Sequence, residues 1–110
     1  MVRPALQRGE VWLVNLDPTI GAEIKKTRPC LVVSPSELHD YLRTALVVPL
    51  TSKGFAAPFR VAVQFDGVSG LALLDQIRTV DKMRLAKRLG AIDEAVLQTI
   101  LETLQELFAA

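Results

Sequence analysis

The stretch Phe59-Arg60-Val61-Ala62-Val63-Gln64-Phe65 decides the fold class, because apolar and polar side chains alternate along it. A period of two residues is typical of a β-strand with one face buried and the other in water. We therefore expect the core to receive Phe59, Val61, Val63 and Phe65. Arg60, Ala62 and Gln64 are expected on the outer face.

Short apolar runs on both sides of this stretch predict further strands. Each run is rich in β-forming residues and is bounded by proline, glycine or charged residues. The predicted strands cover residues 11–16, 30–33, 45–50, 71–80 and 86–91, with a long loop over 17–29, a second loop over 51–58 and a turn over 66–70. Pro49 favours a sheet edge or a bulge near the end of its strand.

Three helical segments are predicted between and after the strands. Ser34 has the position of a cap, so a short helix should cover Pro35 to about Leu42. Asp81 is expected to cap a short turn of helix through Arg84. After Asp93, apolar residues recur every three or four positions, which predicts a longer amphipathic helix. Its stripe consists of Val96, Leu97, Ile100, Leu101, Leu104, Leu107 and Phe108.

Together these elements predict one mainly β domain over residues 1–110, a small antiparallel barrel with attached helices. The single histidine and single cysteine exclude an internal disulfide, a Cys-rich zinc site and two-histidine catalysis within one chain. We expect Cys30 to be buried and inert, and His39 to have a surface or packing role. No apolar run is long enough to span a membrane, and no signal peptide is evident, so the expected location is the cytoplasm.

Charge is distributed unevenly along the chain. Residues 93–110 hold four carboxylates and no lysine or arginine, so they carry −4. Because the net charge of the chain is +1, the other 92 residues carry +5. A basic body can face phosphates, although a solvated acidic helix on an ordinary domain explains the same numbers.

Polar residues at the ends of predicted strands are the candidates for a functional site. Arg28 precedes the strand over 30–33, and Pro29 favours an extended backbone that holds it at the sheet. Thr51 follows the strand over 45–50. Asp75 and Gln76 interrupt an apolar strand, where polar groups cost stability unless they are paired or functional.

A structural explanation of these residues stays open beside the functional one. Arg28 could pair with Asp75, Thr51 could cap a turn, and Gln76 could bond to backbone. No nucleotide-binding glycine motif and no metal-ligand spacing occurs in the sequence.

The same blocks of residues resemble the MazF/PemK family of bacterial toxins, the ribonuclease halves of toxin–antitoxin pairs. The similarity runs through the whole chain in ordered blocks. These are Gly9-Glu10-Val11-Trp12, residues 16–23, residues 28–34, Val48-Pro49-Leu50-Thr51-Ser52, residues 75–82, Arg84-Leu85 and the apolar helix.

The resemblance implies an SH3-like small β-barrel, shared with the CcdB toxins, that works as a homodimer. It implies sequence-selective and metal-independent cleavage of single-stranded RNA, with no cofactor. The products would be a 2′,3′-cyclic phosphate and a 5′-hydroxyl. It also implies a cognate antitoxin whose acidic C-terminal segment blocks the RNA groove.

The resemblance assigns Arg28 and Thr51 as the catalytic residues, because they match the family's R-P and P-x-T blocks. The RNA-binding residues that it implies are Glu23, Lys25, Ser52, Lys53, Asp75, Gln76 and Arg84. One branch of the family places a catalytic histidine and a further arginine where this chain has Ala22 and Leu73. That version of the site is therefore excluded here.

Two other functions remain as alternatives. A gyrase poison of the CcdB type would need an apolar C-terminal anchor, and residues 107–110 are apolar. A catalytically silent barrel would bind RNA or an antitoxin-like peptide without turnover.

Overall fold

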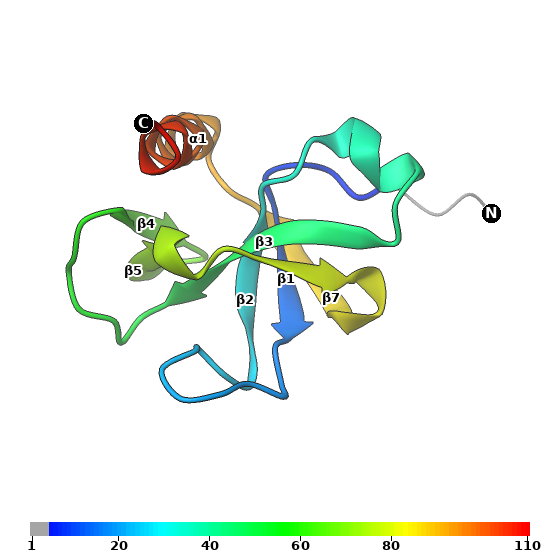
Figure 1. Ribbon diagram of the computed structural model, residues 1–110, viewed down its shortest axis with the longest axis horizontal. Coiled ribbons are helices and arrows are strands. Elements are labelled where there is room, and N and C mark those ends of the chain that lie inside the picture. The colour runs from blue at the N-terminus through cyan, green and yellow to red at the C-terminus, as the bar shows by residue number, and fades with distance from the viewer. Residues whose placement is uncertain (1–4) are drawn as a thin grey trace.

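A computed structural model describes residues 5–110 and shows a mainly β fold with one long helix (Figure 1). The strands are β1 (Glu10–Asn15), β2 (Thr27–Val32), β3 (Thr44–Thr51), β4 (Arg60–Phe65), β5 (Val68–Leu73), β6 (Arg78–Asp81) and β7 (Leu85–Ala91). Three 3₁₀ helices, η1 (Ser36–Asp40), η2 (Leu74–Gln76) and η3 (Lys82–Arg84), precede the α-helix α1 (Glu94–Leu107). Residues 1–4 lie outside the described residues. The start of the predicted domain and the start of the N-terminal stretch without a signal-peptide pattern both fall within them. Within 5–110, no helix is long and apolar enough to cross a bilayer.

Every pair of neighbouring strands is antiparallel, in the order β4-β5-β3-β2-β1-β7, and β6 also pairs with β3. The sheet is curved like a barrel, but no hydrogen-bonded ladder joins β4 to β7 in the described part of the chain. Side chains approach there instead. Phe65 of β4 lies against Gly90 of β7, where an added Cβ would be 3.2 Å from the ring. The predicted antiparallel fold is thus confirmed, with an open barrel.

Residues 30–32 of β2 and 47–50 of β3 are buried on both faces of the sheet, and their alternating side chains divide the interior into two cores. Leu31 and Val48 belong to the main core, whereas Cys30 and Val47 belong to the small core. The main core contains Val11, Leu31, Val33, Val48, Leu50, Val63, Ala72, Leu74, Ile92, Leu97, Ile100 and Leu104. The small core contains Val14, Leu16, Cys30, Val32, Val47 and Val80.

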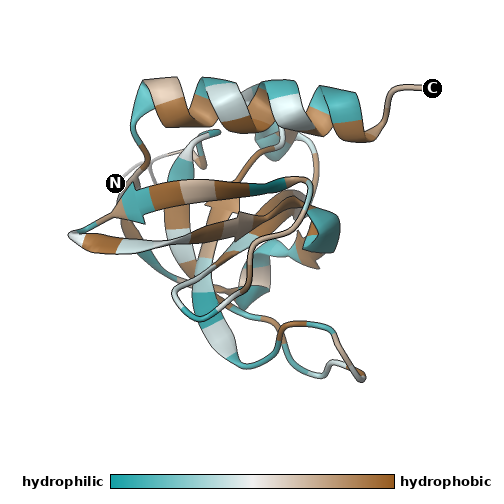
Figure 2. Ribbon diagram, turned by 90° about the vertical axis from the view of Figure 1, so that its left-hand side faces the viewer, coloured by the Kyte–Doolittle hydropathy of each residue, from teal (hydrophilic) through white to brown (hydrophobic). Residues whose placement is uncertain are grey.

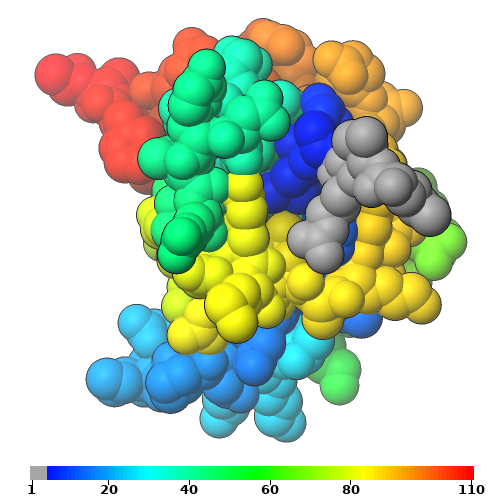
Figure 3. Space-filling model, turned by 90° about the vertical axis from the view of Figure 1, so that its right-hand side faces the viewer, coloured from blue at the N-terminus to red at the C-terminus, as the bar shows by residue number. Residues whose placement is uncertain are grey.

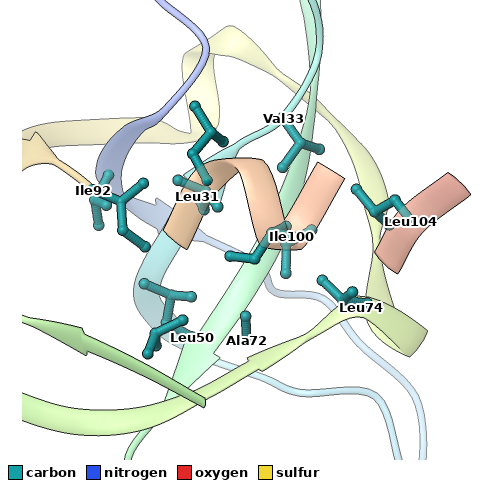
Figure 4. Close-up of a cluster of buried hydrophobic side chains, with 12 residues drawn as sticks. Leu31, Val33, Leu50, Ala72, Leu74, Ile92, Ile100 and Leu104 are labelled. Carbon is teal, nitrogen blue, oxygen red and sulfur yellow. The ribbon is translucent and has the colours of Figure 1, made fainter. Parts of the chain in front are cut away.

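Helix α1 covers the main core and begins as predicted, because the Asp93 carboxylate accepts the N–H of Ala95 at 2.8 Å. Its apolar stripe faces the sheet (Figure 2). Ile100 and Leu104 point among the side chains of the strands (Figure 4). Phe108 is the exception in the predicted stripe, since it follows the end of the helix and is 72% exposed.

The alternating stretch of residues 59–65 forms β4 from Arg60 onward and pairs with β5 in a tight hairpin. Val61, Val63 and Phe65 face the main core as predicted. Phe59 does not, because it lies before the strand in a left-handed conformation (φ 64°) and is exposed. The predicted turn over 66–70 is too long, since β5 already begins at Val68.

Two other predicted strands were wrong in extent. Residues 71–80 are not one strand, because η2 interrupts them and turns the chain from β5 to β6. The second strand starts at Thr27 rather than residue 30, since Arg28 pairs with Val14. Pro49 lies inside β3 at the point where the partner strand changes. The residues up to Val47 pair with β6, and the residues from Leu50 onward pair with β5.

The short helix after β2 forms, but Ser34 does not cap it. The hydroxyl of Ser34 is buried instead, where it accepts the N–H of Leu46 and shares a 2.6 Å hydrogen bond with Nε2 of His39. Nδ1 of His39 donates to the carbonyl of Leu6 at 2.7 Å. The packing role expected for His39 is therefore confirmed.

We expect Ile100→Ala to lower the free energy of unfolding by about 2–5 kcal/mol, because the side chain is fully buried and its loss leaves a cavity. Chemical denaturation measures this value. Phe108→Ala is the control and should change stability by less than about 0.5 kcal/mol. Equal losses in the two variants would contradict the packing described for α1.

Candidate functional site

Arg28 and Thr51 lie at neighbouring strand ends. Strands β2 and β3 pair from Val32–Val47 to Cys30–Pro49, and Arg28 and Thr51 each lie two residues beyond this last pair. Side chains two residues apart along a strand project from the same face of the sheet. Arg28 therefore shares a face with Cys30, and Thr51 shares a face with Val47, and both Cys30 and Val47 belong to the small core. The two residues predicted to be catalytic thus lie on the side of the sheet that carries the small core.

Arg28 is half-buried, and its Nε donates to the carbonyl of Lys25 at 2.8 Å. This bond fixes the base of the guanidinium group. Among residues 5–110 Arg28 forms no ion pair, so its terminal nitrogens are available to a ligand. The suggested pairing of Arg28 with Asp75 is wrong, because Asp75 pairs with Arg60.

Thr51 ends β3, and its hydroxyl oxygen accepts the N–H of Lys53 at 3.2 Å. The turn-capping role that we considered is therefore present, and it leaves the hydroxyl proton free to donate. Gly70 of β5 makes this position possible, because an added Cβ would lie 2.5 Å from the carbonyl oxygen of Thr51. A glycine inside a strand is the sequence signal for such a close approach.

An open groove of about 630 Å³ lies between the β1–β2 loop, residues 16–26, and the segment around η2. It is lined by Pro18, Ala22, Glu23, Ile24, Asp75, Gln76, Ile77 and Arg78. Three of the predicted RNA-binding residues, Glu23, Asp75 and Gln76, therefore line one groove. Four others, Lys25, Ser52, Lys53 and Arg84, lie outside its lining.

Gln76 uses its amide to hold the β1–β2 loop. Its Oε1 accepts the N–H of Ile24 at 2.6 Å, and its Nε2 donates to the carbonyl of Ala22 at 3.4 Å. The suggestion that Gln76 satisfies backbone groups is therefore confirmed. Glu23 also contributes to the shape of the loop, since its carboxylate accepts the N–H of Ile20 at 2.7 Å.

Two arginines hold the other part of the same loop. Arg78, which we did not select from the sequence, lines the groove and donates to the carbonyl of Leu16 at 3.0 Å. Arg84 donates to the carbonyls of Asn15, at 3.1 Å, and of Asp17. Figure 3 shows the loop (blue) projecting below η3 (yellow), which carries Arg84. The loop is thus anchored along its length.

Arg60 and Asp75 form a bidentate ion pair at the groove, with Nε–Oδ1 and Nη2–Oδ2 distances of 3.1 and 3.0 Å. The hydrogen bonds from Arg60 lower the pKa of the Asp75 carboxyl, more than its partial burial raises it. The same pair raises the pKa of Arg60. The alternating pattern of residues 59–65 predicts Arg60 on the outer face of β4 but does not identify its partner, because the pairing depends on the β4–β5 hairpin.

Cys30 is buried as expected, and burial raises the pKa of its thiol to about 12. The positive charges of Arg78 and Arg28 oppose this rise in the pKa of Cys30. Two positions hold a histidine and an arginine in one branch of the family but not in this chain. Here they are Ala22, which lines the groove, and Leu73, which is buried. No group of three or more His, Cys, Asp or Glu gathers into a metal-binding arrangement over residues 5–110.

We expect Arg60→Met to raise the pKa of Asp75 toward its ordinary value of about 3.9. Because folding lowers this pKa, the pair stabilises the fold above the ordinary value, and the contribution is lost as the pH falls through the lowered pKa. An NMR titration of the carboxyl carbon measures the shift. Arg88→Met, which breaks the separate pair with Glu10, should leave Asp75 unchanged. An identical Asp75 pKa in wild type and Arg60→Met would contradict the pairing.

Known proteins match the chain over nearly its whole length. The family model for the PemK-like, MazF-like toxin of type II toxin–antitoxin systems matches residues 7–108. Endoribonuclease PemK of Escherichia coli is 44% identical over 102 residues, covering 87% of this chain and 77% of the relative. Endoribonuclease EndoA of Bacillus subtilis is 30% identical over 106 residues, covering 91% of both chains.

Solved structures give the same result. MazF from Deinococcus radiodurans superposes with a TM-score of 0.84 at 30% identity, covering 96% of this chain and 97% of the other. A mycobacterial endoribonuclease in complex with its cognate antitoxin has a TM-score of 0.77 at 25% identity and covers 93% of both chains. Since the family model spans almost every residue described above, and the fold agrees with that of MazF, the chain belongs to the PemK-like, MazF-like toxins of type II toxin–antitoxin systems.

Proposed function

We propose that this toxin is a sequence-selective endoribonuclease that cuts single-stranded RNA without a metal ion and so inhibits translation. The observation that carries the proposal is the position of Arg28 and Thr51, each two residues beyond the last pair of the β2–β3 ladder and on the face of the small core. Its relatives named PemK and EndoA are endoribonucleases. The whole chain acts as one domain in this proposal.

RNA suits such a site because it carries its own nucleophile, the 2′-hydroxyl. The 2′-oxygen attacks the adjacent phosphorus and loses its proton, and the bond from phosphorus to the 5′-oxygen breaks. The 5′-oxygen takes up a proton. The products are a 2′,3′-cyclic phosphate and a 5′-hydroxyl, and no water is consumed.

Arg28 stabilises the charge that develops at phosphorus. Its Nε is held by the carbonyl of Lys25, so the terminal nitrogens can fork onto the two non-bridging oxygens. Thr51 donates its hydroxyl proton to the same phosphate, while its oxygen still accepts from Lys53. Arg28 and Thr51 are therefore the proposed catalytic residues.

The groove under the β1–β2 loop holds the RNA strand, and Arg28 and Thr51 act from outside its lining. Glu23, Asp75 and Gln76 shape the groove and contact bases, with Gln76 acting from its place under the loop. Four further residues contact phosphates or sugars at its margins: Lys25 of the loop, Arg84, which bonds to the start of the loop, and Ser52 and Lys53, which directly follow Thr51.

We also propose three features of the biological setting. The toxin acts as a homodimer in the bacterial cytoplasm. A cognate antitoxin with a disordered acidic C-terminal segment occupies the same groove, since such segments fold onto basic surfaces. The structure of the mycobacterial endoribonuclease contains its cognate antitoxin, and a crystal structure of the Deinococcus radiodurans protein is of a MazE–MazF complex, which supports an antitoxin here.

One observation favours a second function, a gyrase poison. Phe108 is 72% exposed near the C-terminus, so an apolar anchor is available there. The assay below separates the two functions, because a gyrase poison would not cut RNA.

In excess EDTA, wild-type protein should cut a long mixed-sequence RNA at discrete sites, and Arg28→Ala should lower kcat by about 10²–10³-fold. The loss follows from the missing donors at the phosphate. Mapping of the fragment ends measures both the motif and the products, which should carry 5′-hydroxyl groups. Arg43→Ala, an exposed arginine on another part of the surface, is the matched control and should retain activity.

Three results would overturn this mechanism. They are full activity of a folded Arg28→Ala protein, loss of cleavage in EDTA, and cleavage of a substrate with 2′-deoxyribose at the cut site. Absence of cutting by folded wild type would favour the silent binder or the gyrase poison.

Cleavage should slow as the salt concentration rises, because a basic body that contacts phosphates releases counterions from the RNA. The plot of log kcat/KM against log salt should become less steep by about 0.7 for each phosphate contact removed, the value for a single strand. Lys25→Gln and Lys53→Gln test this directly. A rate that does not depend on salt in wild type would contradict phosphate contacts at these residues.

A further inference from the structure

Phe55 lies in the loop between β3 and β4 with 73% of its surface exposed. A phenyl ring left in water forgoes the stabilisation that burial provides. Scattered exposed apolar residues are common, so exposure alone carries no function. The contacts of this ring distinguish it from such residues.

One side of the Phe55 ring lies on the guanidinium of Arg60, whose central carbon is 4.6 Å from the ring centroid. Nη1 of Arg60 also donates to the carbonyl of Phe55 at 3.1 Å. The guanidinium itself is fixed by its two hydrogen bonds to Asp75, and its side chain is only 10% exposed. The ring is therefore held by a rigid support while the rest of it stays in solvent.

The same contacts join Phe55 to the site. Asp75, which fixes Arg60, lines the groove. Gly54, the residue before Phe55, packs on Thr51, because an added Cβ would be 3.0 Å from Cγ2 of Thr51. The Phe55 ring is therefore linked to the groove through Arg60 and Asp75. Phe55 also directly follows Gly54, which packs on the proposed catalytic residue Thr51.

We propose that Phe55 is a stacking platform for one nucleobase of the bound RNA, with Arg60 and Asp75 as its positioning residues. This inference rests on the proposed function and adds a binding position to it. Bases stack on exposed aromatic rings in proteins that bind single strands, and stacking depends little on base identity. A ring already supported on one face loses little freedom when a base covers the other.

Binding to a non-cleavable strand tests the platform separately from catalysis. The probe is a fluorescent single-stranded DNA copy of an RNA substrate, or of the mixed-sequence RNA if no cutting occurs, because it lacks the 2′-hydroxyl but keeps the bases. We expect Phe55→Ala to raise its Kd by about 5- to 100-fold. Phe55→Leu should show a similar loss, since it keeps apolar bulk but cannot stack. Phe55→Trp should restore binding.

Two controls make the outcome specific. Phe108→Ala removes a phenylalanine of similar exposure, 72%, at the end of α1, and should leave Kd unchanged. The Phe55→Trp protein should show fluorescence quenching on binding that the wild type, whose only tryptophan is Trp12, does not show. An unchanged Kd in folded Phe55→Ala, or full binding by Phe55→Leu, would overturn the platform even if RNA is cleaved.

The reverse result is equally distinct. If wild type does not cut RNA but Phe55→Ala still weakens binding to the DNA probe, the platform stands and the nuclease proposal fails. If cleavage occurs, Phe55→Ala should raise KM more than it lowers kcat, because stacking stabilises the bound strand before and during the reaction.

Discussion

The burial of the central residues of β2 and β3 on both faces of the sheet is the constraint on which the rest of the structure depends. Their central side chains, residues 30–32 and 47–50, are apolar on both faces, so each face needs its own cover. Helix α1 supplies one cover, and the inward residues of β1 and β6 supply the other. Strands held from both sides have little freedom to shift in register, because a slip of one residue would exchange the two cores. Arg28 and Thr51 stand at the ends of this rigid pair, which fixes their relative position.

The elements predicted well from sequence are those specified by local patterns. Helix α1 has an apolar stripe and the Asp93 cap, and η3 begins at the predicted cap Asp81. The elements predicted poorly depend on distant partners. Ser34 has the sequence pattern of a cap, yet its hydroxyl bonds to His39 and Leu46 inside the fold. No local pattern contains that information.

The candidate site shows the same division. Its residues could be chosen from strand ends and from the family resemblance, but their connections could not. Gln76 reaches a loop that lies 52 positions earlier in the chain. Arg60 looked like a solvent-facing strand residue, although the β4–β5 hairpin brings it to Asp75. Such pairs arise only when the chain folds, so a single sequence assigns the chemistry of the groove better than its geometry.

Helix α1 lies on the opposite side of the molecule from the β1–β2 loop (Figures 1 and 2). The helical end carries −4, from Asp93, Glu94, Glu102 and Glu106, and the remaining chain carries +5. Acidic charge is therefore concentrated on the side of the molecule away from the β1–β2 loop, while the groove lining itself holds Glu23 and Asp75 beside Arg78. A polyanion that approaches from the side of the helix meets four carboxylates and is repelled there, which favours approach from the side of the loop. The acidic helix that closes the main core thus also disfavours one direction of approach for a negatively charged partner.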